Sequence, residues 1–75
     1  MSRTKTAPTI EIIANGEPRT IPVGQTVAAF LAGRGLDPDV VVVERNGEIV
    51  PRSRFRELRL VADDRLEVVH IVGGG

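Results

Sequence analysis

Leu66-Glu67-Val68-Val69-His70-Ile71-Val72 is an apolar stretch of strand length near the end of the chain. Its residues do not alternate cleanly between apolar and polar, which is typical of a strand that is buried on both faces. Such a strand lies in the middle of a sheet. We therefore expect this segment to be the central strand, with the rest of the chain arranged around it.

A tight hairpin is predicted at the beginning of the fold. The run 9–14 is β-branched and partly alternating, and Asn15-Gly16 follows it, the pair that best supplies the two positive φ angles of a two-residue turn. The return strand would cover residues 17–23. Pro18 and Pro22 cannot donate hydrogen bonds to a neighbouring strand, so we expect the return strand at an edge of the sheet.

One helix is predicted, between residues 26 and 34. Thr26 is a favourable N-cap, and four residues after it fall at helical spacing: Val27, Phe30, Leu31 and Arg34. Gly35 suits the left-handed position just beyond the helix, and Leu36 is placed to fold back over the last turn. Pro38 prevents continuation. A helix this short is unstable alone in water, so its apolar stripe must cover a sheet.

A second hairpin should follow the helix. The run 40–45 is apolar and β-branched, and Asn46-Gly47 turns it into a short strand over 48–50. Residues 52–60 predict an irregular or single-turn connection. Its expected anchors are the apolar side chains of Phe55, Leu58 and Leu60.

The order hairpin, helix, hairpin, irregular segment, strand predicts an α+β domain of the ubiquitin-like β-grasp type. Its mixed sheet should have four to five strands, with the one main helix packed across one face. The last strand must lie beside the first to join the two halves. We expect a disordered N-terminal arm over 1–8, the β-grasp domain over 9–72 and a flexible glycine tail over 73–75.

Length and composition exclude several classes of function. The 75 residues have room for one small domain, and 41% of them are apolar, enough for a core without disulfides. The absence of cysteine excludes a disulfide scaffold, thiolate catalysis and Cys-ligated zinc. Ten basic and ten acidic residues balance, which argues against binding to nucleic acid or to an anionic membrane. We expect a cytoplasmic protein without a signal or membrane segment, whose partners are proteins.

The glycine tail Gly73-Gly74-Gly75 carries the most specific chemistry. A terminal carboxylate is an anion at neutral pH and can attack the α-phosphorus of ATP, which converts it into an acyl-adenylate. Sulfur delivered to that acyl carbon gives a thiocarboxylate on Gly75. Glycine lets the walls of a partner close directly on the backbone. A frayed terminus or a cloning remnant is the alternative, but the position directly after a predicted central strand favours the functional interpretation.

A three-residue tail reaches only about 10 Å, so the partner must also hold the folded domain. Ordering glycines is entropically costly, and part of the affinity has to come from that contact. Ile71, Val72 and their apolar neighbours are the candidate partner-binding residues, together with Gly73 and Gly74.

With these features the chain resembles the ThiS family of thiamine-biosynthesis sulfur carriers, from about Thr9 to Gly75. The most specific agreement is Asn46-Gly47-Glu48-Ile49-Val50-Pro51-Arg52 with an aromatic residue, Phe55, shortly after it. Further matching stretches are Gly24-Gln25-Thr26-Val27, Leu66-Glu67-Val68-Val69 and the terminal glycines. Family members often have Asp-Gly-Asp before the last strand, where this chain has Ala62-Asp63-Asp64. Asp63 tolerates the left-handed conformation, so we expect the turn to form. Gly73 is a third glycine that lengthens the tail.

The resemblance implies a sulfur-carrier co-substrate and not an enzyme, with Gly75 as the residue that becomes the thiocarboxylate. It implies two partners: a ThiF-like adenylating enzyme, which uses ATP, and a ThiG-like thiazole synthase. The carrier itself is expected to bind no cofactor. A molybdopterin-type carrier, a ubiquitin-like protein modifier and a plain β-grasp interaction module remain alternatives that the sequence does not exclude.

Three other features have simpler interpretations. His70 is a lone histidine, which makes neither a metal site nor a triad, and we assign it no catalytic role. Four arginines are close in sequence: Arg52, Arg54, Arg56 and Arg59. A solvated face explains them, so they form at most a secondary interface. The acidic pairs at 37/39 and 63/64 suit turns and need no metal.

Overall fold

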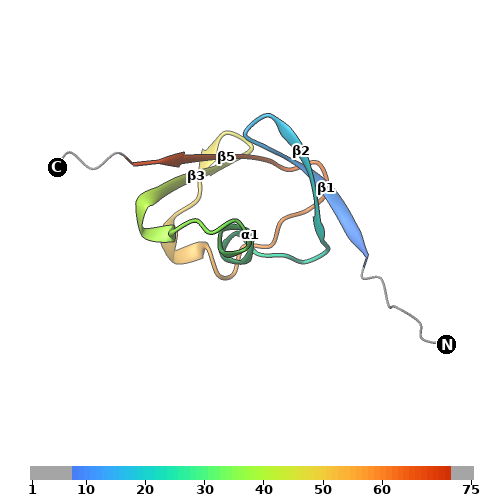
Figure 1. Ribbon diagram of the computed structural model, residues 1–75, viewed down its shortest axis with the longest axis horizontal. Helices are drawn as coiled ribbons and strands as arrows, with labels where there is room; N and C mark the ends of the chain where they lie inside the picture. Colours follow the sequence, from blue (N-terminus) through green and yellow to red (C-terminus); the bar gives the residue numbers. More distant parts are fainter. Residues whose placement is uncertain (1–7, 72–75) are drawn as a thin grey trace.

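The computed structural model describes residues 8–71, which form a five-stranded sheet with one α-helix against one face (Figure 1). The predicted arm over 1–8, apart from Pro8, and the tail over 73–75 lie outside the described residues. The strands are β1 (Thr9–Ala14), β2 (Glu17–Pro22), β3 (Val41–Arg45), β4 (Glu48–Ile49) and β5 (Arg65–His70). The helix is α1 (Val27–Gly33), and single 3₁₀ turns are η1 (Pro38–Val40) and η2 (Arg52–Arg54).

The strand order is β2-β1-β5-β3-β4, which confirms that the last strand is central and lies beside the first. β5 runs parallel to β1 and antiparallel to β3. The β1–β5 ladder is short and ends where Ala14 pairs with Leu66. Beyond it the side-chain amide of Asn15 takes the place of a strand: Val68 N–H donates to Oδ1 (2.7 Å) and Nδ2 donates to the Val68 carbonyl (3.2 Å).

The expectation that the final strand is buried on both faces is wrong. Leu66 is buried beneath the helix, but Glu67 and Val69 on the opposite face are exposed. A single helix covers only one face of the sheet, and in the described residues no second layer lies on the other. The central position of β5 therefore comes from pairing along both edges, and its apolar residues on the second face are open to solvent.

The first hairpin has the predicted turn and the predicted edge position. Asn15 and Gly16 have φ angles of 50° and 82°. Val23 N–H donates to the Pro8 carbonyl (3.0 Å), which fixes the hydrogen-bonding phase of the β1–β2 pair. In this phase the odd-numbered residues of β2 point their backbone groups towards β1. Pro18 and Pro22 occupy positions whose N–H would point outward, so they remove two of the donors that an edge strand would otherwise expose.

The helix has the predicted caps at both ends. Ala29 N–H donates to Thr26 Oγ1 (3.1 Å) at the start. At the end Leu36 N–H donates to the Leu31 carbonyl (2.9 Å) and Gly35, with φ of 71°, closes a Schellman motif. The helix ends at Gly33 with Arg34 as C-cap, within one residue of the prediction.

The core lies between α1 and the covered face of the sheet. The largest fully buried side chains are Ile12, Val27, Leu31, Val41, Val43, Leu60 and Leu66. The connection over 52–60 is a single turn followed by irregular chain, as predicted. Phe55 and Leu60 are buried, and Leu58 is half-buried against the core, so all three apolar residues anchor it.

The turn over 62–64 contains a buried carboxylate, that of Asp64. Asp63 takes the left-handed conformation (φ 70°), as expected. Asp64 accepts hydrogen bonds from Arg45 Nε (2.9 Å), from Asn46 Nδ2 (3.1 Å) and from the Val61 N–H (2.9 Å). Burial by itself would raise the pKa of Asp64, but these hydrogen bonds outweigh it and hold the pKa below its usual value. The carboxylate therefore ties the second hairpin to the start of β5.

Candidate functional site

The structure describes the base of the predicted carrier tail. Of the predicted tail and partner-binding residues, Val72, Gly73, Gly74 and Gly75 lie outside the described residues. Ile71 is the last described residue; its N–H donates to the Val40 carbonyl (2.8 Å) and its side chain is exposed. Pairing between β5 and the β3 side of the sheet thus continues to Ile71. Whatever follows this residue starts from a fixed point on the central strand.

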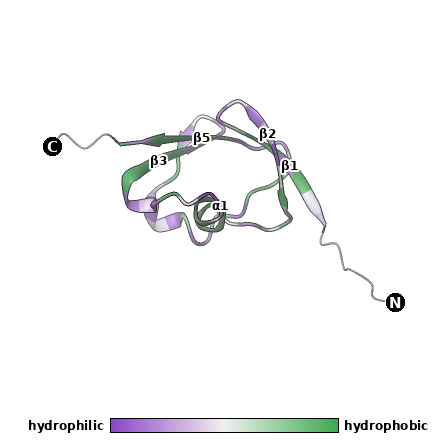
Figure 2. Ribbon diagram, viewed as in Figure 1, coloured by the Kyte–Doolittle hydropathy of each residue, from purple (hydrophilic) through white to green (hydrophobic). Residues whose placement is uncertain are grey.

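The face of the sheet opposite the helix carries an exposed apolar patch next to this point. Strand alternation places Val69 and Ile71 on this face, and Val42 lies directly opposite Val69 in the β3–β5 pair. Ile49 of β4 joins them through its pairing with Glu44. We call these four residues the open-face patch: Val42, Ile49, Val69 and Ile71. Figure 2 shows the hydrophobic stretches of β3 and β5 beside each other.

Val42 is half-buried, and the other three residues of the patch are exposed. Val23 and Val61 are similarly exposed elsewhere, so the distinguishing feature of the patch is that its residues share one face of the sheet. The fractional exposures are 67% for Ile49, 58% for Val69 and 48% for Ile71. Large β-branched side chains at this exposure lose favourable burial unless another molecule covers them. Sequence reasoning identified Ile71 and its apolar neighbours but not Val42, Ile49 or Val69 individually. Their shared face becomes visible only when the strand register and the position of the single helix are known.

Two carboxylates lie beside the apolar residues of the patch, in the same row across the strands as Ile49. Glu44 and Glu67 are directly opposite each other in the β3–β5 pair, on the same open face as Val42 and Val69. Like charges in directly opposite positions destabilise a sheet. Their juxtaposition makes the rim of the patch acidic and favours a partner surface that brings a basic side chain to it.

The arginines of the 52–59 segment are exposed, and two of them also hold the segment in place. Arg52 donates to the carbonyls of Pro38 (2.8 Å) and Val41 (3.3 Å), and Arg59 donates to the Gly24 carbonyl (2.8 Å). Arg54 pairs with Glu57 at 3.0 Å. The contacts of Arg52 and Arg59 fasten the connection to η1, β3 and the loop before α1, whereas the Arg54–Glu57 pair lies within the connection itself.

Residues 8–71 contain neither a metal-ligand cluster nor a membrane-spanning helix. No group of three or more His, Cys, Asp or Glu side chains within residues 8–71 is placed to hold a metal ion. No helix in this part of the chain has the length and apolar character needed to cross a membrane. The feature that the described residues do offer is the open-face patch, with Glu44 and Glu67 beside it, next to Ile71 at the end of the described chain.

Comparison with known proteins points to one family. The model of the ThiS family matches residues 12–75. The sulfur carrier protein ThiS of Bacillus subtilis (strain 168) is 44% identical over 50 residues, which cover 67% of this chain and 76% of that protein. A thiazole synthase of Magnetococcus marinus is 42% identical over 66 residues, 88% of this chain. The chain spans only about a fifth of the length of that thiazole synthase.

Solved structures give the same result for the fold. The crystal structure of a thiamine biosynthesis protein (ThiS) from Geobacter metallireducens is similar to this chain with a TM-score of 0.77 at 28% identity. The superposition covers 88% of this chain and 100% of that protein. This similarity confirms the predicted β-grasp architecture, including the mixed sheet and its one helix.

Proposed function

Since this chain belongs to the ThiS family, we propose that it is a sulfur carrier of thiamine biosynthesis whose cargo is a thiocarboxylate on Gly75. The observation that carries the proposal is the extent of the family match, which runs from residue 12 through residue 75 and so includes all three glycines. The carrier is a co-substrate that is loaded and emptied in each cycle in the cytoplasm, and the catalysts are its partners.

Loading takes two steps, and the terminal carboxylate is the one group that the carrier contributes to them. A carboxylate oxygen of Gly75 attacks the α-phosphorus of ATP, forming a C–O–P linkage and releasing pyrophosphate. A hydrosulfide then attacks the acyl carbon, the C–S bond forms and AMP leaves with the electrons of the broken C–O bond. The carrier binds no cofactor in this scheme, because ATP is bound by a ThiF-like adenylating enzyme.

The open-face patch supports the use of such a partner. The glycine tail has to enter the active site of the enzyme, which costs conformational entropy. Contact with Val42, Val69 and Ile71 compensates for this cost because it buries apolar surface immediately beside the tail. The patch and the tail then work as one unit: the patch docks, and the tail carries the carboxylate into the active site.

The unloading partner is a ThiG-like thiazole synthase. Proteins named thiazole synthase contain a region that is more than 40% identical to most of this chain. A carrier region in the same polypeptide as a synthase would be present at a high effective concentration. That arrangement supports a working association between this kind of carrier and a thiazole synthase.

Intact mass spectrometry tests the loading reaction. The full chain is incubated with a ThiF-like enzyme, ATP and sulfide, and we expect a gain of about 16 Da from replacement of oxygen by sulfur. A variant that lacks Gly75 serves as the matched control and should stay at its starting mass. If the enzyme loads its own carrier under these conditions and this chain gains no mass, the proposed function is wrong.

A further inference from the structure

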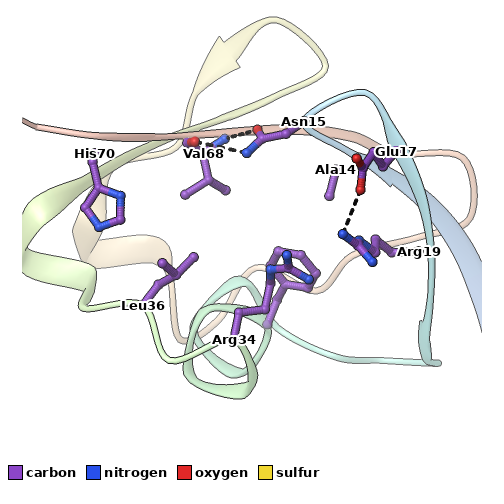
Figure 3. Close-up of a pocket in the computed structure, with 9 residues that line it drawn as sticks. Ala14, Asn15, Glu17, Arg19, Arg34, Leu36, Val68 and His70 are labelled. Atoms are coloured by element: carbon purple, nitrogen blue, oxygen red, sulfur yellow. Dashed lines mark hydrogen bonds and ion pairs between the residues drawn. The ribbon is translucent and has the colours of Figure 1, made fainter.

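The helix-covered side of the molecule contains a cavity that shares no lining residue with the open-face patch. It has a volume of about 350 Å³ and lies between the end of β5, the β1–β2 hairpin and the C-terminal end of α1. Its apolar walls include Phe30, Leu36 and Val68, and its polar groups include Arg19, Arg34 and His70 (Figure 3). The cavity is on the face of the sheet opposite the open-face patch, so a ligand here would not compete with docking of the tail.

The charge in this cavity is predominantly positive. Glu17 is the carboxylate among its lining residues, and it pairs with Arg19 Nη2 at 2.8 Å. Arg34 forms no ion pair with any carboxylate of residues 8–71. Its guanidinium lies over the ring of Phe30, with 5.6 Å between the guanidinium carbon and the ring centroid. This stacking holds the guanidinium at the cavity wall with its N–H groups available at the edge.

Arg19 provides a second unsatisfied donor. Its Nε is buried and has no hydrogen-bond partner within the described residues, although its Nη2 is bonded to Glu17. A buried donor without an acceptor is costly, but this Nε is closed to solvent. The side chain is 39% exposed through its other atoms, and those are the atoms that a ligand in the cavity reaches. The C-terminal end of α1 carries a partial negative charge. Two of its carbonyls, those of Leu31 and Ala32, already accept hydrogen bonds from the N–H groups of residues 34–36.

We propose that this cavity binds a small molecule that carries one oxyanion group on a compact apolar body. The guanidinium groups of Arg34 and Arg19 take the oxyanion, because their forked donors match the oxygens of phosphate and carboxylate. The apolar body lies against Phe30 and Leu36. A cavity of this volume is at the lower end of the range for small-molecule sites and fits a single aromatic ring with its anionic group.

Titration of the full chain with phenyl phosphate, followed by amide NMR, tests the proposal. We expect saturable shifts at residues 15–19, 34–36 and 68–70, with a Kd of about 1 mM or lower. Phenol, which has the apolar body without the charge, should produce much smaller shifts. Benzoate in a parallel titration distinguishes a carboxylate ligand from a phosphate ligand, and the tighter of the two identifies the preferred oxyanion.

Variants of two exposed arginines assign the binding to the cavity. Arg34→Gln should weaken binding of phenyl phosphate at least about tenfold, and Arg34→Lys, which keeps the charge but loses the fork, should fall between it and the parent. Arg54→Gln is the matched control, since Arg54 is exposed and pairs with Glu57 away from the cavity. Three results would overturn the proposal. They are equal effects of the Arg34 and Arg54 substitutions, shifts centred on residues 52–59, and binding of phenol as tight as that of phenyl phosphate. The absence of saturable shifts at about 10 mM probe would also overturn it.

Discussion

The two faces of the sheet are made from the same strands but serve different purposes. On the covered face, Leu66 of β5 and Val43 of β3 are completely buried under α1. One residue further along each strand, Glu67 and Glu44 face solvent in directly opposite positions. The stability of the domain is concentrated on the covered face, whereas the open face keeps exposed apolar groups and opposed charges that give no advantage to the isolated chain. Substitutions on the two faces should therefore have separable effects on stability and on partner recognition.

The largest effect is expected from a cavity on the covered face. Leu66→Ala removes a fully buried side chain from the central strand and should lower the free energy of unfolding by about 2–5 kcal/mol. Urea denaturation followed by circular dichroism measures it. Glu67→Ala, one residue away on the open face, is the matched control and should change stability by about 1 kcal/mol at most. Similar losses from both substitutions would show that the faces do not differ as described.

Asp64→Asn should have the next largest effect, about 1–3 kcal/mol at neutral pH, because Arg45 loses its carboxylate partner in a buried position. The pKa of Asp64 is lower in the folded state than in the unfolded chain, so its contribution is present above about pH 4 and is lost as pH falls through the folded-state value. Urea midpoints measured at several pH values should therefore converge for the two proteins in acid. A stability difference that is independent of pH would contradict this assignment.

On the open face, Val69→Asp should leave the stability within about 1 kcal/mol of the parent but reduce kcat/KM of the adenylation reaction at least about tenfold. The physical reason is that a charge replaces an apolar contact at the centre of the open-face patch. Val23→Asp is the control, because Val23 is similarly exposed (54%) but follows β2, away from the patch. Equal rates for the two variants would exclude the patch as the docking surface.

The smallest effect should be a gain. Glu67→Gln removes one of the two opposed carboxylates on the open face and should stabilise the isolated domain by about 0.2–1 kcal/mol. The gain should shrink at high salt, where the repulsion in the parent is screened. Denaturation at low and high ionic strength measures both quantities. A loss of stability on substitution would mean that Glu44 and Glu67 do not repel each other in the folded protein.

Local chemistry explains which parts of the fold were predictable. The turns at Asn15 and Asn46, the helix caps and the edge position imposed by Pro18 and Pro22 depend on residues that are close in sequence, and all were confirmed. The exposed second face of β5 was missed because burial depends on how many layers cover a sheet. A run of valines does not indicate whether one face of the sheet or both faces are covered.

The missed interactions join residues that are distant in the chain. Asp64 bonds Arg45 and Asn46 across sequence separations of 19 and 18 residues, and was expected only to be a turn residue. Asn15 was recognised as a turn former, but its side chain also satisfies Val68, 53 residues away. At the candidate site, Ile71 was identified from its position before the glycines, whereas Val42 and Ile49 required the register. The arginine-lined cavity needed the three-dimensional arrangement of four separate elements.

The prolines of β2 also determine how this molecule can associate with others. At that edge, Thr20 alone among residues 17–22 keeps an outward backbone donor, and β4 at the opposite edge is two residues long. Neither border of the sheet is suited to templating the addition of a foreign strand. Encounters are thereby restricted to side-chain surfaces, whose contacts dissociate quickly when they are small. A sulfur carrier that is loaded by one protein and unloaded by another depends on such short-lived complexes.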